Sequence, residues 1–355
     1  MTPSVTLSTS YPLARAAFLA AAESAGAVVD RFEHPLTGPE GESLGIDVAE
    51  LGQVDAATVV MIVSATHGVE GYCGSALQTH WLSHFAHQRP ADTRVVNVHA
   101  FNPFGMAWVR RVNEDNVDLN RNFVDWSQPP PHNVEYDGIA ADVVPAEWTA
   151  DEQQRTLEAL LALVGEWGFP KMQAVVSGGQ YAHPKGVFYG GTGPVWSHRW
   201  LREWCTTNLG AAQRVIIIDL HTGLGPWGHG ELIASAMPGH PLFDRAAALW
   251  PDSISMMSGD SVSTIVAGDW LNAAAQLAPH AEVTPICIEY GTVDGVSVLQ
   301  SLRADAWLHG YGDPTAPEAA AVRAQVRAAF ADDDPAWIET CWPRFQEVLG
   351  AALAS

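Results

Sequence analysis

Short apolar runs rich in valine and isoleucine recur along the chain, separated by longer stretches of helical character. Each run is apolar at consecutive positions, which is typical of strands that are covered on both faces of a sheet. The pattern predicts strands at Val59–Val63, Arg94–His99, Ala174–Ser177, Val215–Leu220 and Pro285–Glu289, and helices at Ser75–Ala86, Asp151–Trp167, Trp196–Asn208, Pro241–Trp250 and Asp269–Leu277.

This alternation of strands and helices predicts an α/β fold, in which a mixed, mostly parallel twisted sheet is flanked by helices on both faces. An alanine-rich helix is expected to begin near Ser8–Ser10, and a long proline-rich surface loop is expected over residues 126–145. No stretch has the composition of a linker, so residues 1–355 are expected to form a single domain. Its C-terminal extension, from about residue 312 to 355, contains two predicted helices, Pro317–Ala331 and Ala336–Ala352, which should pack on the sheet.

Composition narrows the class of protein. With 47% hydrophobic and 16% charged residues, the 355-residue chain can bury a substantial core. The 40 acids against 18 bases give a formal net charge of −22, which disfavours nucleic acids and anionic membranes as partners. No apolar run approaches the roughly 20 residues that span a bilayer. The N-terminal region does not resemble a signal peptide, and the four cysteines form no CxxC pair, so a reducing, cytoplasmic location is expected.

Polar residues that can bind a metal ion or transfer a proton directly follow the predicted strands. His67 and Glu70 come after the first of these strands, Asn102 after the second and His221 after the fourth, while Glu289 ends the fifth. In an open α/β sheet, the carboxyl ends of the strands form the edge where ligands bind. We therefore expect these separate segments to meet at one site.

The residue types in this set are those of a hydrolytic zinc site. Such a site commonly uses two histidines and one carboxylate, and keeps the fourth position open for water. In the segment SATHGVEG (64–71), the glycines allow a tight turn that aims His67 and Glu70 at one point. His221 is the expected third ligand of one Zn²⁺ per chain, and Asp219 is a candidate to orient it. Glu289 is the expected general base.

Each of these candidate ligands could instead have a purely structural role. A lone HxxE pair is common in exposed turns, and a lone histidine is more often part of the core; it is the joint pattern that favours a metal. A second candidate chelate is formed by His80, His84 and His87, at i, i+4 and i+7 of a predicted helix. No carboxylate accompanies these three histidines, so we interpret them as a surface stripe.

The segment FNPFGMAWVRRVNEDNVDLNRNF (101–123) concentrates arginines in a chain that has few bases. An arginine can bind a carboxylate through two parallel hydrogen bonds, and a neighbouring asparagine can add a third. An arginine with an adjacent asparagine, as at Asn120 and Arg121, is therefore expected to bind the carboxylate of a substrate, and a second arginine near the metal to stabilise a developing oxyanion. The alternative is that the arginines pair with Glu114, Asp115 and Asp118, which we favour for Arg110 but not for Arg111 or Arg121.

Taken together, these motifs resemble the M14-type zinc carboxypeptidases and their DUF2817 branch. The HxxE pair, Asn102-Pro103, the arginine-to-DLNRNF segment, the strand-end histidine and the late glutamate occur in the family's order. The segment GGQYAHPKGVFYGG (178–191) is similar to the DUF2817 branch in particular. The resemblance implies a sheet of about eight strands, one zinc ion held by His67, Glu70 and His221, and catalysis by Glu289 and Arg111.

The resemblance also implies a metallocarboxypeptidase-like hydrolase that cleaves an amide bond in a small peptide or N-acyl amino acid with a free carboxylate. One departure matters, since the family's mobile tyrosine has no counterpart between Tyr189 and Tyr290. An N-acyl amino acid deacylase of the aspartoacylase and succinylglutamate desuccinylase type is therefore the alternative enzyme. A catalytically inactive binding protein is the alternative from another class.

Overall fold

The computed structural model describes residues 4–355 and contains a mixed sheet of eight strands in the order β1-β2-β4-β3-β5-β8-β6-β7. The four central strands β4, β3, β5 and β8 run parallel, while β1, β2 and β6 are joined by antiparallel pairs. The predicted fold class is therefore confirmed. The strands are β1 (Val28–Thr37), β2 (Ser43–Leu51), β3 (Thr58–Ser64), β4 (Thr93–His99), β5 (Arg214–Trp227), β6 (Gly230–Ala234), β7 (Ile254–Ser255) and β8 (Glu282–Gly291).

The central strands are buried on both faces, as their consecutive valines and isoleucines predict. One face of the sheet packs against α1, α2, α8 and α11, and the opposite face packs against α7 and the segment around Trp270. The helix expected after Ser10 is α1, and the second of the two expected C-terminal helices, α11, lies on the sheet. These helices are α1 (Tyr11–Ser24), α2 (Gly71–His84), α7 (Trp196–Asn208), α8 (Pro241–Leu249) and α11 (Pro335–Ala354).

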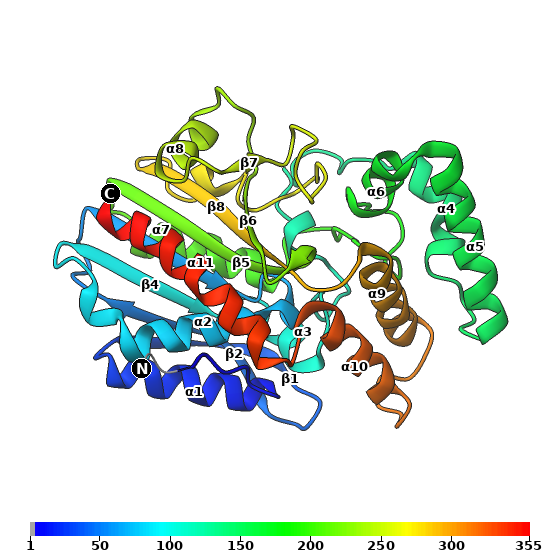
Figure 1. The fold of residues 1–355 in the computed structure, drawn as a ribbon, viewed down its shortest axis with the longest axis horizontal. Coiled ribbons are helices and arrows are strands. Elements are labelled where there is room, and N and C mark those ends of the chain that lie inside the picture. Colours follow the sequence, from blue (N-terminus) through cyan, green and yellow to red (C-terminus); the bar gives the residue numbers. More distant parts are fainter. Residues whose placement is uncertain (1–3) are drawn as a thin grey trace.

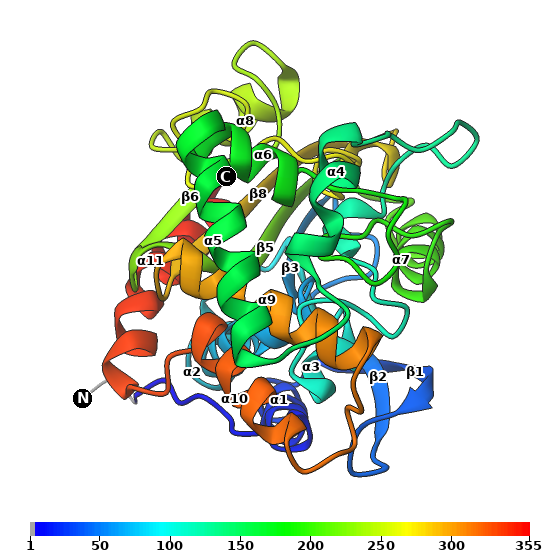
Figure 2. The same cartoon turned by 90° about the vertical axis from the view of Figure 1, so that its right-hand side faces the viewer.

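A separate layer of helices lies beyond the carboxyl ends of the central strands (Figure 1). In the second view these helices stand in front of the sheet and cover its edge (Figure 2). Their apolar side chains form a third cluster with the turn that follows β3. The layer contains α4 (Val134–Val143), α5 (Ala150–Trp167), α6 (Phe169–Ser177), α9 (Gly295–Gly310) and α10 (Ala319–Phe330), and the short helix α3 (Pro103–Trp108) lies near its base.

Three predicted elements are wrong. Residues 174–177 belong to helix α6, where a proline occupies the first turn and Met172, Val175 and Val176 are buried at helical spacing. Residues 269–277 form turns and one 3₁₀ turn, Ala274–Gln276, because the Asp269 side chain accepts from the Leu271 amide and stabilises a turn. The expected loop over 126–145 contains α4, whose N-terminus is capped by Asn133.

The sequence patterns also missed β1, β2, β6 and β7. Strand β1 is an edge strand with mostly exposed or half-buried residues, so it lacks the apolar run by which the central strands are found. The histidine stripe on α2 is only partly at the surface, since His80 is buried and packs edge-on against Trp342. Over the described range 4–355, no helix is both long enough and apolar enough to cross a membrane.

Candidate metal centre

Three segments far apart in sequence bring the predicted ligands together. His67 precedes the single 3₁₀ turn Gly68–Glu70 that follows β3, and His221 lies on β5 directly opposite Glu289 of β8. The turn lies against α3 so closely that a Cβ atom on Gly68 would come within 2.0 Å of the Gly105 backbone. A glycine is therefore required there, because any larger residue would push His67 away from β5.

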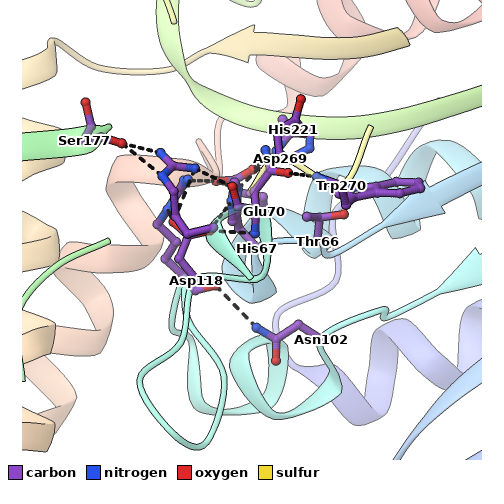
Figure 3. Close-up of polar contacts among 12 residues, drawn as sticks. Thr66, His67, Glu70, Asn102, Asp118, Ser177, His221, Asp269 and Trp270 are labelled. Carbon is purple, nitrogen blue, oxygen red and sulfur yellow. Dashed lines mark hydrogen bonds and ion pairs between the residues drawn. The ribbon is translucent and has the colours of Figure 1, made fainter. Parts of the chain in front are cut away.

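The three side chains converge on one point (Figure 3). His67 Nδ1 lies 2.9 Å from Glu70 Oε1, and His221 Nδ1 lies 3.0 Å from Glu70 Oε2. The two Nδ1 atoms are 3.1 Å apart. All three side chains are buried. The structure thus brings together the complete predicted set of His67, Glu70 and His221.

The outer nitrogen of each histidine is held by a second carboxylate. His67 Nε2 lies 3.2 Å from Asp118 Oδ1, and His221 Nε2 lies 2.6 Å from Asp219 Oδ2. When Nε2–H donates to these carboxylates, both Nδ1 lone pairs point at the same place. Two lone pairs and a carboxylate at this distance repel unless a cation or a proton lies between them. The donor set therefore fits a divalent metal ion, and carboxylate-oriented histidines are the usual arrangement around zinc.

The electrostatics of the centre also favour positive charge. Burial by itself would lower the pKa of His221, but the carboxylates of Asp219 and Glu70 raise it well above the usual value. Burial would raise the pKa of Asp118, yet the charges of Arg111 and Arg121 hold it well below its usual range. The lowered pKa of Asp118 keeps its carboxylate ionised, and the raised pKa of His221 shows that these buried surroundings stabilise positive charge at the centre.

Glu289 lies beside the three ligands and contacts none of them by a hydrogen bond. Its Oε1 accepts from the Leu224 amide at 3.0 Å, which fixes the orientation of the carboxyl group. Burial and the neighbouring charge of Glu70 raise the pKa of Glu289 to about 7. A second group of potential ligand atoms consists of His221, Cys287 and Glu289, so Glu289 is within reach of the same centre.

The arginines are arranged differently from the prediction. Arg111 donates from Nη1 to Glu70 at 2.9 Å and from Nε to Asp118 at 3.0 Å, so the pairing with Asp118 that we disfavoured is present. Arg110, for which we expected pairing with a nearby acid, instead pairs with Asp305 of α9 at 3.0 Å. Sequence proximity suggested the wrong partner for Arg110 because Asp305 lies 195 residues away on α9, and only the packing of that helix brings the two side chains together.

Arg121 is buried and donates mainly to backbone oxygens. Its Nη1 also lies 3.9 Å from Asp118 Oδ2, so the pairing with Asp118 that we disfavoured for Arg121 is present as well. Its Nε and Nη2 donate to the carbonyl of Ser177 at 3.0 and 2.6 Å, and its Nη1 donates to the carbonyl of Asn120 at 2.9 Å. Nη1 and Nη2 each keep a second N–H group that makes none of these three hydrogen bonds. Asn120 accepts the Trp270 amide through Oδ1 at 3.1 Å, which leaves its Nδ2 to donate. Both residues line the same cavity as the metal centre.

This cavity measures about 240 Å³ and opens over the metal centre. His67, His221, Glu289, Arg111 and Arg121 line its floor. Its remaining walls come mostly from the layer of helices at the edge of the sheet. The cavity therefore gives a small molecule access to the candidate ligands.

Asp118 is the functional residue that sequence reasoning interpreted too narrowly. It was considered only as a structural partner for arginines, whereas it contacts His67, Arg111 and the Asn120 amide at once.

Replacing Asp118 with asparagine should keep the hydrogen bond to His67 but lose the charge, so we expect zinc affinity to fall about 10- to 100-fold. Competition with a chromophoric chelator measures this loss. Asp125→Asn, seven residues further along the chain, is the matched control, because the Asp125 side chain is exposed and its carboxylate accepts hydrogen bonds only from Ser127. Equal zinc affinities of D118N and the wild type would show that Asp118 does not contribute to metal binding.

Comparison with known proteins gives one family and several distant structures. The family described as "Protein of unknown function (DUF2817)" matches residues 7–344. No curated protein is significantly similar in sequence.

Similar solved structures include carboxypeptidase A from Helicoverpa armigera, which has 16% identity and a TM-score of 0.45 over 91% of this chain and 74% of that one. A succinylglutamate desuccinylase from Silicibacter sp. has 14% identity and a TM-score of 0.40 over 81% and 67%. An aspartoacylase family protein from Mesorhizobium loti has 12% identity and a TM-score of 0.39 over 81% and 67%. These scores mark distant similarity, and no functional assignment follows from them.

Proposed function

Since the chain belongs to DUF2817, a family of proteins of unknown function, we propose its activity from the site itself: a zinc-dependent hydrolase that cleaves an amide bond in a small substrate with a free carboxylate. One observation carries the proposal. His67, Glu70 and His221 converge at the floor of a cavity, with the unpaired side of Glu289 beside them. This combination of ligands and a neighbouring carboxylate is what metal-assisted hydrolysis requires.

A zinc ion held by His67, Glu70 and His221 would act as a Lewis acid that polarises a carbonyl and lowers the pKa of a water molecule. Asp118 and Asp219 keep the two imidazoles in the tautomer that presents Nδ1 to the centre. Trp270 and Thr66 donate to Asp219, at 2.7 Å and at 2.8 Å, and so hold that carboxylate in place. The centre is thus positioned by groups from four parts of the chain.

Glu289 is the proposed general base. The Leu224 amide fixes one carboxylate oxygen, which leaves the other to take a proton from the attacking water and pass it to the leaving amine. Arg111 is proposed to face the negative charge that develops on the carbonyl oxygen. Its Nε and Nη1 are bound to Asp118 and Glu70, which hold the guanidinium rigid, and its Nη2 remains to donate.

Asn120 and Arg121 are proposed to bind the substrate's carboxylate. The available donors are Asn120 Nδ2 and the remaining hydrogens on Arg121 Nη1 and Nη2. The Ser177 carbonyl fixes the plane of the guanidinium, so little side-chain entropy is lost on binding. A free carboxylate on the substrate offsets the charge of a buried arginine, which a neutral amide does not.

Dipeptides and N-acyl amino acids, each paired with its carboxamide, provide the test. We expect the zinc-loaded protein to cleave carboxylate substrates, and a chelator to abolish cleavage until zinc is restored. The matching carboxamides should have kcat/KM lower by about tenfold or more, from the loss of a charge-assisted hydrogen bond. Cleavage that persists after the metal is removed, or no cleavage of either class by zinc-loaded protein, would refute the proposed function.

A further inference from the structure

The cavity over the metal centre extends well beyond it, into the layer of helices. Two turns of α5, most of α6 and the first half of α9 form its far walls. The side chains on these walls are mainly aliphatic: Leu157, Leu160, Leu161, Val164, Met172, Val176, Val296, Val298, Leu299 and Leu302. This part of the cavity offers no charged group along α5 or α6.

The rim of the cavity is unusually apolar for a surface. Leu161 is 50% exposed, Phe169 is 56% exposed and Val296 is 46% exposed. They come from three different elements and all line the same cavity. Apolar side chains gathered at one exposed opening mark a site that binds an apolar group.

Polar contacts at one end of the cavity fix helix α9 against α4 and α5. The buried Arg303 of α9 donates to the Val143 carbonyl at 2.7 Å and to Thr156 Oγ1 of α5 at 2.6 Å. Arg110 binds α9 from the opposite side through Asp305. These bonds fix the position of α9, which contributes Val296, Val298, Leu299 and Leu302 to the cavity wall, relative to α4 and α5.

We propose that this extension of the cavity binds an extended aliphatic chain on the acyl side of the scissile amide, so that the substrates are N-acyl amino acids with medium-length acyl chains. The inference rests on the proposed function, because Asn120 and Arg121 would hold the amino-acid half and leave the apolar walls to the acyl half. Residues 157–164 of α5 extend about 10 Å along the helix axis, which suits a chain of about eight carbons better than one amino-acid side chain.

A series of N-acyl alanines with acetyl, hexanoyl, octanoyl and hexadecanoyl groups tests the chain length. We expect kcat/KM to rise about threefold per added methylene up to about eight carbons, and then to level off. Equal kcat/KM for acetyl and octanoyl alanine would overturn the inference. A preference for dipeptides with a single apolar side chain over octanoyl alanine would also overturn it.

Binding to the metal-free protein separates this inference from the proposed function. Calorimetry of octanoyl and acetyl alanine in the presence of chelator should show an affinity for the octanoyl compound higher by at least tenfold. If this difference is found but the zinc-loaded protein cleaves neither compound, the proposed hydrolysis fails and the apolar site stands. If cleavage is found without any chain-length dependence of binding, the apolar site fails and the hydrolysis stands.

The rim offers a substitution that leaves the core intact. Leu161→Asp should lower kcat/KM and affinity for octanoyl alanine at least tenfold, while those for acetyl alanine stay within about twofold. The separate variant Leu161→Met should keep the chain-length preference of the wild type, since methionine is apolar and similar in size to leucine. Leu13→Asp, at an equally exposed position (56%) on α1, is the matched control and should change neither value. Equal losses for both substrates in L161D would contradict the assignment.

Discussion

The Glu289→Gln variant is expected to bind zinc normally and to lose nearly all turnover. Glutamine has the shape of glutamate and can still accept the Leu224 amide, but it cannot take a proton from water. General base catalysis typically contributes about 10²- to 10⁴-fold, so kcat should fall by that factor, equivalent to about 3–5 kcal/mol of transition-state stabilisation. Because Glu289 makes no hydrogen bond to His67, Glu70 or His221, the metal content should stay at one zinc per chain.

Initial rates and elemental analysis of the same E289Q preparation check this expectation. Glu282→Gln is the matched control: it lies at the start of the same strand, half-exposed, and its nearest charged partner, Arg214, is 3.7 Å away. E282Q should keep wild-type rates. Turnover in E289Q within tenfold of the wild type would show that another group removes the proton, whereas loss of zinc would show that Glu289 is a ligand.

The second large effect is expected from His221→Ala. Alanine removes one of the three ligands and also frees Asp219 from its 2.6 Å contact with the imidazole. Loss of an orienting carboxylate typically costs about 10- to 100-fold in metal affinity, and loss of a ligand itself should cost more than 100-fold. Activity should disappear with the metal. The fold should persist, since Asp219 keeps its bonds from Thr66 and Trp270.

Zinc titration against a chromophoric chelator, with circular dichroism to monitor folding, measures the effect of H221A. His229→Ala is the control, because His229 is an exposed histidine in the connection between β5 and β6. It should bind zinc as the wild type does. Unchanged zinc stoichiometry and affinity in folded H221A would place the metal elsewhere in the chain.

Much of the sheet is visible in local sequence. Strands β3, β4, β5 and β8 are buried on both faces, so burial itself produces their consecutive apolar positions. Strand β1 was not predicted because an exposed edge strand has no such run of apolar residues. The strand predicted at residues 174–177 is wrong because three consecutive apolar residues fit both a strand and a buried helical turn, and only the packing of α6 distinguishes the two.

The chemical groups of the centre are likewise present in the sequence, since the residues that follow the central strands must meet at one edge of the sheet. His67, Glu70, His221 and Glu289 could be named on that basis, and the structure places them together. Asp219, two residues from His221 on the same strand, could be named as its partner, and the two side chains are in contact. The partner of His67 could not be predicted, because no local pattern indicates that Asp118 lies against its outer nitrogen, 51 residues away in sequence.

By itself, then, the sequence determined the kind of sheet, the strand ends that carry the ligands and the residue types available there, because these follow from local burial and connectivity. Tertiary structure alone decided that Asp118 orients the imidazole of His67 and that Glu70, Asp118 and the Ser177 carbonyl hold the arginines. It also decided that α5, α6 and α9 enclose an apolar cavity over the centre. These features depend on contacts between segments far apart in the chain, and no short stretch of sequence contains them.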